Sequence, residues 1–148
     1  MRCCLSPEAS RRILSEINES KGAQKMLGQH LTHANFSVDD LAAAKIFYVD
    51  KLGFTAEKQD EYGVLLKSGA GTRVFVYQKP DHQAWDSTVL GIEVDDVKAA
   101  VGELRASGIS IEKLDGTDAD GIMTIPDMGE AAWFRDPAGN WICVSRMT

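Results

Sequence analysis

The stretch SVDDLAAAKIFYVDKLGFTAEK, residues 37–58, returns in altered form as EVDDVKAAVGELRASGISIEK, residues 93–113. The VDDL of the first stretch matches the VDDV of the second, and Gly53 matches Gly108 once a single deletion is allowed. Self-similarity of this kind is typical of a supersecondary unit that occurs more than once in a chain. The sequence therefore predicts two copies of one structural module.

Each copy has the same order of local signals. An alternating apolar and polar run, over 31–38 and again over 88–94, predicts a strand. An Asp-Asp pair then supplies a helix N-cap and negative charge for the first turn. A helix with one apolar face follows and ends at a glycine. The residues on these two faces are Leu41, Ala44, Tyr48 and Leu52 in the first copy and Val97, Ala100, Val101 and Leu104 in the second.

Three further strands are expected to complete each copy. In the first copy we place them at about 54–59, 61–67 and 72–78, and in the second the turn RDPAGN joins 131–135 to 141–146. The predicted fold class is α+β, with two βαβββ modules that form a cupped mixed sheet. The modules span about 30–79 and 86–148 of one domain, 29–148.

Residues 1–28 differ from the rest of the chain. Ser6 and Pro7 suit a helix start, and Ile13, Leu14 and Ile17 give a short apolar stripe. We predict an N-terminal helical arm, either a packed extension or a clasp between two copies of the chain.

The composition of the chain argues against two classes of partner, nucleic acids and membranes. The chain of 148 residues carries a net charge of -6, which argues against a nucleic acid partner. No run of apolar residues is long enough for a membrane partner. Cys3, Cys4 and Cys143 form no CxxC pair, which indicates a reducing compartment, and we expect a cytoplasmic location.

Strand alternation separates two faces of the predicted sheet. One face is apolar and should form the core: Ala34, Phe36, Val38, Val74, Val76, Leu90, Ile92, Val94, Ile142 and Val144. The other face mixes aromatic and polar groups: His33, Asn35, Ser37, Arg73, Phe75, Tyr77, Val89, Gly91, Glu93, Trp141, Cys143 and Ser145. This composition favours a ligand cavity over a solvated sheet face, because its aromatic rings are poorly suited to open water.

The modules resemble the vicinal oxygen chelate superfamily, which includes glyoxalase I, bleomycin-resistance proteins, fosfomycin-resistance enzymes and extradiol dioxygenases. The likeness covers roughly residues 30–146 and rests on HANFSVDDLAAAKIFYVDKLGF and AAWFRDPAGNWICV. The resemblance implies a metal ligand at four positions, two on the first strand and two on the last strand of the modules. These positions fall on His33, Val89, Phe75 and Cys143.

Only His33 among these four is a usual ligand, since hard divalent ions need several nitrogen or oxygen donors. We therefore predict no metal site and no cofactor. The alternative is a divalent metal held through His33, for example Zn²⁺ with Cys143 and further donors from a partner chain or substrate.

The remaining candidate residues allow more than one role. His33 could act as a general base, a role that histidine often fills in enzymes. Glu93 is either a second acid-base group or an ion-pair partner of Arg73, and the ion pair is the favoured interpretation. Arg73 could hold an anionic group, and Cys143 is interpreted as a small buried side chain rather than a nucleophile. The remaining predicted ligand contacts are Asn35, Phe75, Tyr77, Val89 and Trp141.

These observations favour a glyoxalase- and bleomycin-resistance-like protein that binds and sequesters a small, partly aromatic molecule without metal, as a homodimer. The alternative is a lyase, isomerase or dioxygenase of the same superfamily, either metal-dependent or using His33 and Glu93 as acid and base. The acidic loop 115–121 is expected to be mobile, and the resemblance implies a cavity lid at this place, in which Ile122, Met123, Ile125 and Met128 would touch the ligand.

Overall fold

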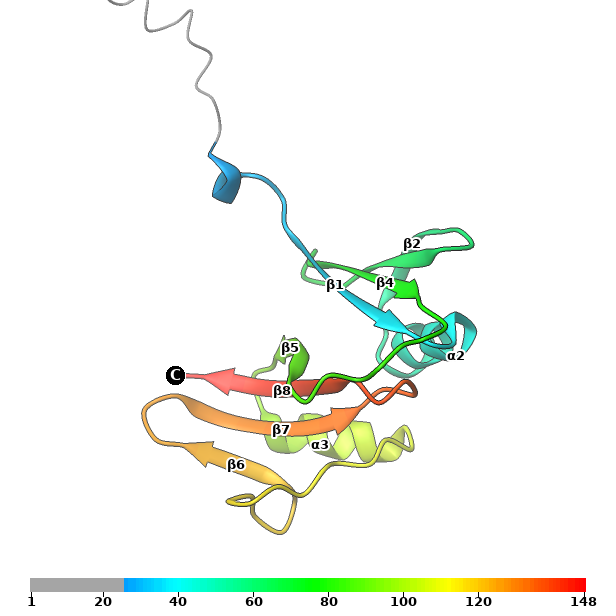
Figure 1. Ribbon diagram of the computed structural model, residues 1–148. Helices are drawn as coiled ribbons and strands as arrows, with labels where there is room; N and C mark the ends of the chain where they lie inside the picture. The colour runs from blue at the N-terminus through cyan, green and yellow to red at the C-terminus, as the bar shows by residue number, and fades with distance from the viewer. Residues whose placement is uncertain (1–25) are drawn as a thin grey trace, which may run out of the picture. The chain divides into compact units, whose positions relative to one another are not determined.

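Within residues 26–148, the part of the chain that the computed structural model describes, the strands form two separate four-stranded sheets (Figure 1). The first sheet has the order β1-β4-β3-β2 and the second the order β5-β8-β7-β6. In each sheet the first and last strands of the module pair in parallel and the other pairs are antiparallel. Equal topology in both halves confirms the predicted duplication and the α+β class.

The strand bounds follow the predicted segments closely. The first module contains β1 (His33–Val38), β2 (Thr55–Gln59), β3 (Gly63–Lys67) and β4 (Arg73–Gln78). The second contains β5 (Thr88–Glu93), β6 (Ile122–Ile125), β7 (Gly129–Arg135) and β8 (Trp141–Met147). The short strand β6 lies in the segment for which we predicted a lid, and Ile122 is buried there. That part of the expectation is wrong, because pairing with β7 makes this segment the edge of the sheet.

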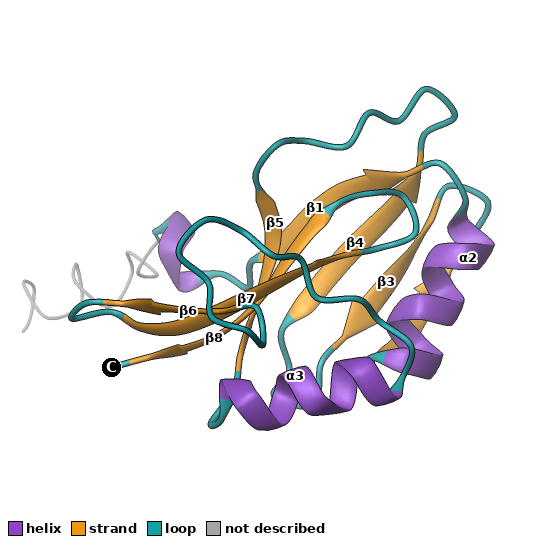
Figure 2. Cartoon of the chain, turned by 90° about the horizontal axis from the view of Figure 1, so that it is seen from below, coloured by secondary structure: helices purple, strands orange, loops and turns teal. Residues whose placement is uncertain are grey.

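Two equivalent helices pack on the sheets. In the first module α2 (Leu41–Lys45) continues as a π-helical segment, η2 (Ile46–Lys51), and in the second module α3 spans Val97–Ala106. Figure 2 shows α2 beside β3 and β4 and α3 along the second sheet. No helix within residues 26–148 combines the length and apolar character that crossing a membrane requires.

The predicted helix ends are present in both copies. The Asp40 carboxylate accepts from the Ala43 amide at 3.0 Å, and the Asp96 carboxylate accepts from the Ala99 amide at 2.9 Å. Gly53 and Gly108 end the helices with φ angles of 76° and 74°, the left-handed conformation that favours glycine. The repeated sequence therefore encodes the same start and stop twice.

Most of the predicted N-terminal arm lies outside the described residues, which begin at 26. Within residues 26–32 the structure has a short 3-10 turn, η1 (Leu27–Gln29). The proposed clasp between two copies therefore stays a prediction.

The apolar face predicted from strand alternation forms the core. Phe36, Val38, Val74, Val76, Leu90, Ile142 and Val144 are buried, and Ala34, Ile92 and Val94 pack against them partly exposed. The core extends across both modules, because Phe47 of η2 packs on Phe134 of β7 with ring centroids 6.3 Å apart. The two sheets are separate, but they share one core.

A buried polar network also joins the modules. Asp136 accepts from the Tyr48 hydroxyl at 2.8 Å and from the Asn140 side-chain amide at 3.0 Å. Asn140 in turn donates to the Ser37 carbonyl at 2.9 Å, at the end of β1. Asp136 and Asn140 are the polar residues of the DPAGN turn, and they are buried. This turn therefore links module two to module one, in addition to connecting β7 with β8.

His82, in the linker between the modules, adds to this junction. Its Nδ1 lies 2.8 Å from the Ser37 hydroxyl and its Nε2 lies 3.2 Å from the Ala138 carbonyl. The carbonyl can only accept, so Nε2 carries the proton and donates. The linker is thereby tied to both modules.

Candidate functional site: two polar and aromatic hollows

The candidate residues of module one lie side by side on one face of its sheet. Parallel register pairs His33 with Arg73, Asn35 with Phe75, and Ser37 with Tyr77. A hollow of about 680 Å³ lies over this face. It is lined by His33, Lys58, Gln59, Asp60, Gly63, Leu65, Arg73 and Phe75. Its volume is in the range of small-molecule sites, and it offers one aromatic ring among several polar groups.

Arg73 is held in this hollow by Glu57. Its Nε lies 2.8 Å from Glu57 Oε2 and its Nη2 lies 3.1 Å from Oε1, a two-pronged ion pair. The hydrogen bond from Arg73 lowers the pKa of the Glu57 carboxyl. The predicted ion pair between Arg73 and Glu93 is wrong. Glu57 falls where the β2–β3 register shifts, and such a bulge redirects a side chain in a way that strand alternation does not predict.

The Phe75 ring can approach β3 closely because residue 63 is glycine. A Cβ at Gly63 would come within 2.8 Å of the Phe75 ring and 2.6 Å of the Val76 carbonyl oxygen. The Phe75 and Tyr77 rings are nearly parallel, with centroids 6.2 Å apart and an interplanar angle of 22°. Tyr77 lines a neighbouring hollow together with Ser37 and the linker residues Lys79, Gln83, Ala84 and Trp85.

Module two carries its own aromatic hollow, of about 270 Å³. It is lined by Asp86, Ser87, Thr88, Leu114, Trp133 and Trp141. The Trp133 indole donates to the Thr88 hydroxyl at 3.1 Å, and the Arg135 guanidinium lies 3.8 Å from the centre of the Trp141 ring. Trp133 and Leu65 were not predicted as lining residues, because they lie on β7 and β3, the third strand of each module, whereas the alternation argument covers only the first and last strands.

Val89 does not face the hollow of module two. The register of β5 against β8 shifts between Thr88 and Leu90, so Val89 sits in a bulge and packs partly buried against the core. Thr88 instead lies opposite Trp141. The prediction that Val89 lies on the cavity face is therefore wrong, because it assumed regular alternation along the strand and a bulge breaks that alternation.

Cys143 lies between Trp133 and Gly91 in the register of the second sheet, and its side chain is buried. Burial raises the pKa of the Cys143 thiol. A thiol in this state is a poor nucleophile and a poor metal ligand, because both roles require the thiolate.

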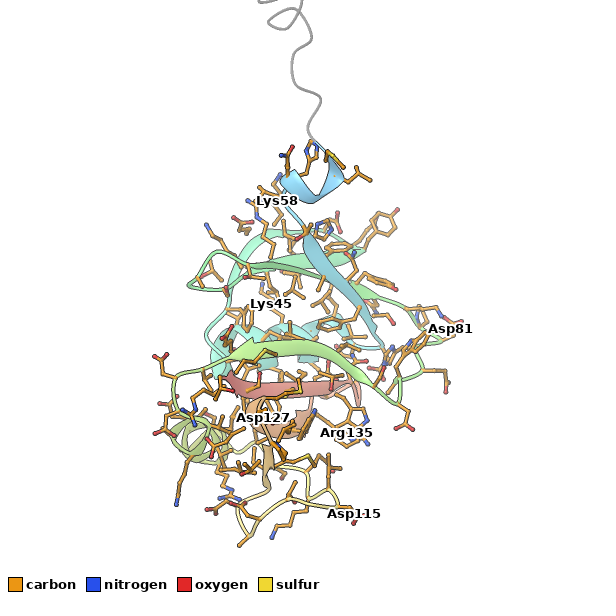
Figure 3. All side chains as sticks on the ribbon, turned by 90° about the vertical axis from the view of Figure 1, so that its left-hand side faces the viewer. Lys45, Lys58, Asp81, Asp115, Asp127 and Arg135 are labelled. Atoms are coloured by element: carbon orange, nitrogen blue, oxygen red, sulfur yellow. The ribbon has the colours of Figure 1, made fainter. Side chains whose placement is uncertain are left out.

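The structure brings only part of the predicted site together. His33, Arg73 and Phe75 share one hollow, Trp141 lines another, and the two hollows have no lining residue in common. Glu93 is exposed on β5 and does not line the hollow that contains His33. Figure 3 shows Lys58, which lines the first hollow, beside the first sheet, and Arg135, which packs on Trp141, beside the second sheet.

The positions that the resemblance marks as metal ligands do not fit a metal ion. They hold His33, Phe75, Val89 and Cys143, of which a phenyl ring and an aliphatic side chain have no donor atom. Within residues 26–148 no three His, Cys, Asp or Glu side chains are grouped as an ion would require.

Comparison with known proteins agrees with the fold and the repeated modules. Residues 30–144 match the family described as the Glyoxalase/Bleomycin resistance protein/Dioxygenase superfamily. This match covers most of the chain, and the protein belongs to that superfamily. Among curated proteins, no relative matches the chain.

Solved structures show the same fold at low sequence identity. A lactoylglutathione lyase from Agrobacterium tumefaciens is 20% identical with a TM-score of 0.63, over 82% of this chain and 96% of that one. A glyoxalase family protein from Enterococcus faecalis is 21% identical with a TM-score of 0.62, over 82% and 100% of the two chains. A glyoxalase/bleomycin resistance protein/dioxygenase from Alicyclobacillus acidocaldarius is 18% identical with a TM-score of 0.61, over 83% and 95%. At these identities the likeness concerns the fold alone.

Proposed function

We propose that this protein binds and sequesters a small, partly aromatic molecule without a metal ion. The observation that carries the proposal is the pair of hollows, in which aromatic rings stand among a few polar groups. Phe75 and Leu65 supply apolar surface in module one, and Trp133 and Trp141 supply it in module two. Large aromatic surfaces with a few fixed polar groups suit a planar organic ligand.

We further propose that a second copy of the chain completes the site. Each hollow alone is open and presents only part of the candidate contacts. β2 and β6 are edge strands of their sheets, and each has one edge without a strand hydrogen-bonded to it, whereas the edge strands β1 and β5 contact each other within the chain. A homodimer that sets module one of one chain against module two of the other would enclose a ligand between Phe75 and the two tryptophans.

Orienting contacts would come from His33, Asn35 and Arg73. Arg73 is already bound by Glu57, so it offers a rigid set of N–H donors. His33, on the first strand, is exposed and can donate or accept. These groups would orient a ligand that carries a carbonyl, hydroxyl or acidic substituent.

Tryptophan fluorescence tests the binding and the joint site together. All three tryptophans lie in the linker or module two, whereas Phe75 lies in module one. We expect saturable quenching by some members of a panel of planar aromatic compounds, in the presence of a chelator. The affinity should fall in Phe75→Ala and stay unchanged in Tyr62→Ala, a matched control at an exposed position outside the hollows. No response across the panel would contradict the function, and quenching insensitive to Phe75→Ala would contradict the shared site.

Sedimentation equilibrium tests the second copy independently. We expect a particle of twice the 16.2 kDa mass of one chain. A strictly monomeric protein that still binds an aromatic ligand would remove the dimer and leave the binding function in place.

Metal content tests the proposal against the enzyme alternative, in which His33 acts with a divalent ion or with Glu93. The protein would be loaded separately with Zn²⁺, Ni²⁺, Mn²⁺ and Fe²⁺, desalted and measured by mass spectrometry. A variant lacking Cys3 and Cys4 serves as control, since adjacent thiols can capture zinc. We expect no stoichiometric ion. One ion per chain that is lost only in His33→Ala would favour the enzyme.

A further inference from the structure

A fourth hollow lies between the modules, at the helices rather than on the candidate faces of the sheets. It has a volume of about 340 Å³ and shares no lining residue with the three hollows described above. We call it the intermodule groove. It is lined by Lys51, Leu52, Gly53, Phe54, Ser68, Gly69, Ile92, Val94, Ala100, Glu103, Leu104, Ser107, Phe134 and Val144. Its surface is mainly apolar, with charges at Lys51 and Glu103.

The groove arises where the two copies of the repeat have diverged. Tyr48 lies eight residues after the N-cap Asp40, and Leu104 lies eight residues after the N-cap Asp96. In module one the Tyr48 ring covers β1, with its centroid 5.7 Å from that of Phe36. In module two the smaller Leu104 occupies the equivalent position. β5 is consequently less well covered, and Ile92 and Val94 remain partly exposed to the groove.

The electrostatics of the groove favour a positive charge. Two helices have their C-terminal ends at the groove. The helical segment η2 ends at Lys51 with its C-cap at Leu52, and α3 ends at Ala106 with its C-cap at Ser107. The C-terminal end of a helix carries partial negative charge, although at the end of α3 the carbonyls of residues 103–105 already accept from the backbone amides of residues 107–109. Glu103 adds a full negative charge, and within residues 26–148 no ion pair engages it. Lys51 carries the opposite charge, and both side chains are exposed, but the Lys51 ammonium group sits on a longer stem than the Glu103 carboxylate and can extend further into water.

We propose that the intermodule groove is a second binding site, which takes a hydrophobic primary amine. The apolar body would lie on Ile92, Val94 and Phe134 in place of the ring that module two lacks. The ammonium group would lie beside the Glu103 carboxylate, near the C-terminal end of α3. The site is separate from the aromatic hollows, so it does not depend on the function proposed for them.

Isothermal titration calorimetry with three probes of equal chain length tests this assignment. Decylamine, decanol and decanoate carry a positive, a neutral and a negative head group. We expect one decylamine per chain, bound about three- to tenfold more tightly than decanol, with decanoate weakest. Glu103→Gln should remove the preference for the amine without changing decanol binding. Glu61→Gln, at an exposed position outside the groove, should leave all three affinities unchanged.

A second pair of variants locates the site. Ala100→Leu places a larger side chain in the groove and should abolish decylamine binding, while Ala99→Leu, at an exposed position of the same helix outside the lining, should have no effect. Circular dichroism would establish that both variants fold. Absence of decylamine binding, equal affinity for the three probes, or unchanged binding in Ala100→Leu would each overturn the proposal.

Discussion

At the scale of single residues, Asp136 has the densest set of contacts in the junction between the modules. Its Oδ1 accepts from the amides of Ala138 and Asn140, and its Oδ2 accepts from Tyr48 and the Asn140 side chain. Burial, with the nearby Asp136 carboxylate, raises the pKa of the Tyr48 hydroxyl well above its usual value, so Tyr48 remains a donor. A buried carboxylate is tolerated here because each oxygen has two donors.

Tyr48→Phe should therefore destabilise the protein. The substitution keeps the ring packing and removes one donor from a buried carboxylate, which costs about 1–3 kcal/mol of unfolding free energy. Urea denaturation measures the change. Tyr62→Phe is the matched control, because Tyr62 is exposed and should shift the midpoint little. Equal stability of both variants would show that water or a rearrangement satisfies Asp136.

Cys143 should be inert to alkylation in the folded protein. Its thiol is buried and its pKa is raised, so little thiolate is present at neutral pH. A raised pKa also means that this group's contribution to stability is full below the ordinary thiol pKa and falls as the pH rises towards the folded value. Iodoacetamide labelling followed by peptide mass spectrometry should modify Cys143 only in denaturant. Rapid labelling of the folded chain at pH 7 would contradict the buried placement.

At the scale of the elements, replacing a glycine with alanine should change the stability of the protein in a direction that depends on where the glycine lies in its helix. Gly102 lies within α3, and a Cβ added there would meet no atom within 4 Å, whereas Gly108 ends the same helix with a φ of 74°. The first glycine weakens a helix and the second permits its termination. The terminating glycine occurs in both modules, as Gly53 and Gly108.

Gly102→Ala should stabilise the protein by about 0.5–1 kcal/mol, because alanine loses less backbone entropy in a helix. Gly108→Ala should destabilise it, because alanine disfavours positive φ. Thermal unfolding of the two variants gives a direct comparison within one helix. A loss of stability in Gly102→Ala would contradict the open space around this position.

At the scale of the whole molecule, the two modules should unfold together. Their buried side chains form one cluster, and the network around Asp136 crosses the junction. Tryptophan fluorescence reports the linker and module two, whereas far-ultraviolet circular dichroism reports both modules. We expect coincident urea transitions from the two signals. An earlier circular dichroism transition would show that module one unfolds on its own.

The fold could be predicted from the sequence because its signals are local and occur twice. The signals are strand alternation, Asp caps and terminating glycines, and each acts within a few residues. Because both copies of the repeat carry the same signals in the same order, the prediction for one copy supports the prediction for the other. Asp40 and Asp96 cap their helices and Gly53 and Gly108 end them, as the sequence indicates. The apolar face likewise follows from alternation, as the burial of Val38, Val76 and Ile142 confirms.

The candidate site was less predictable because it depends on departures from regular strands. The bulge at Val89 turned that residue to the core, and the register shift at Glu57 gave Arg73 a partner that alternation did not indicate. Trp133 could have been found by extending the alternation to β7. The role of Asp136 could not have been found from the sequence, because its partner Tyr48 lies 88 residues away in the chain.

The sequence by itself determined the duplicated modules, their helix ends and the apolar face, since these follow from short-range periodicity and backbone preference. Only the tertiary structure decided that the DPAGN turn joins the modules, that the candidate residues fall into separate hollows, and that a groove remains where Leu104 replaces a tyrosine. These features depend on how side chains that are distant in the sequence pack together or leave cavities, and local sequence patterns do not predict this packing.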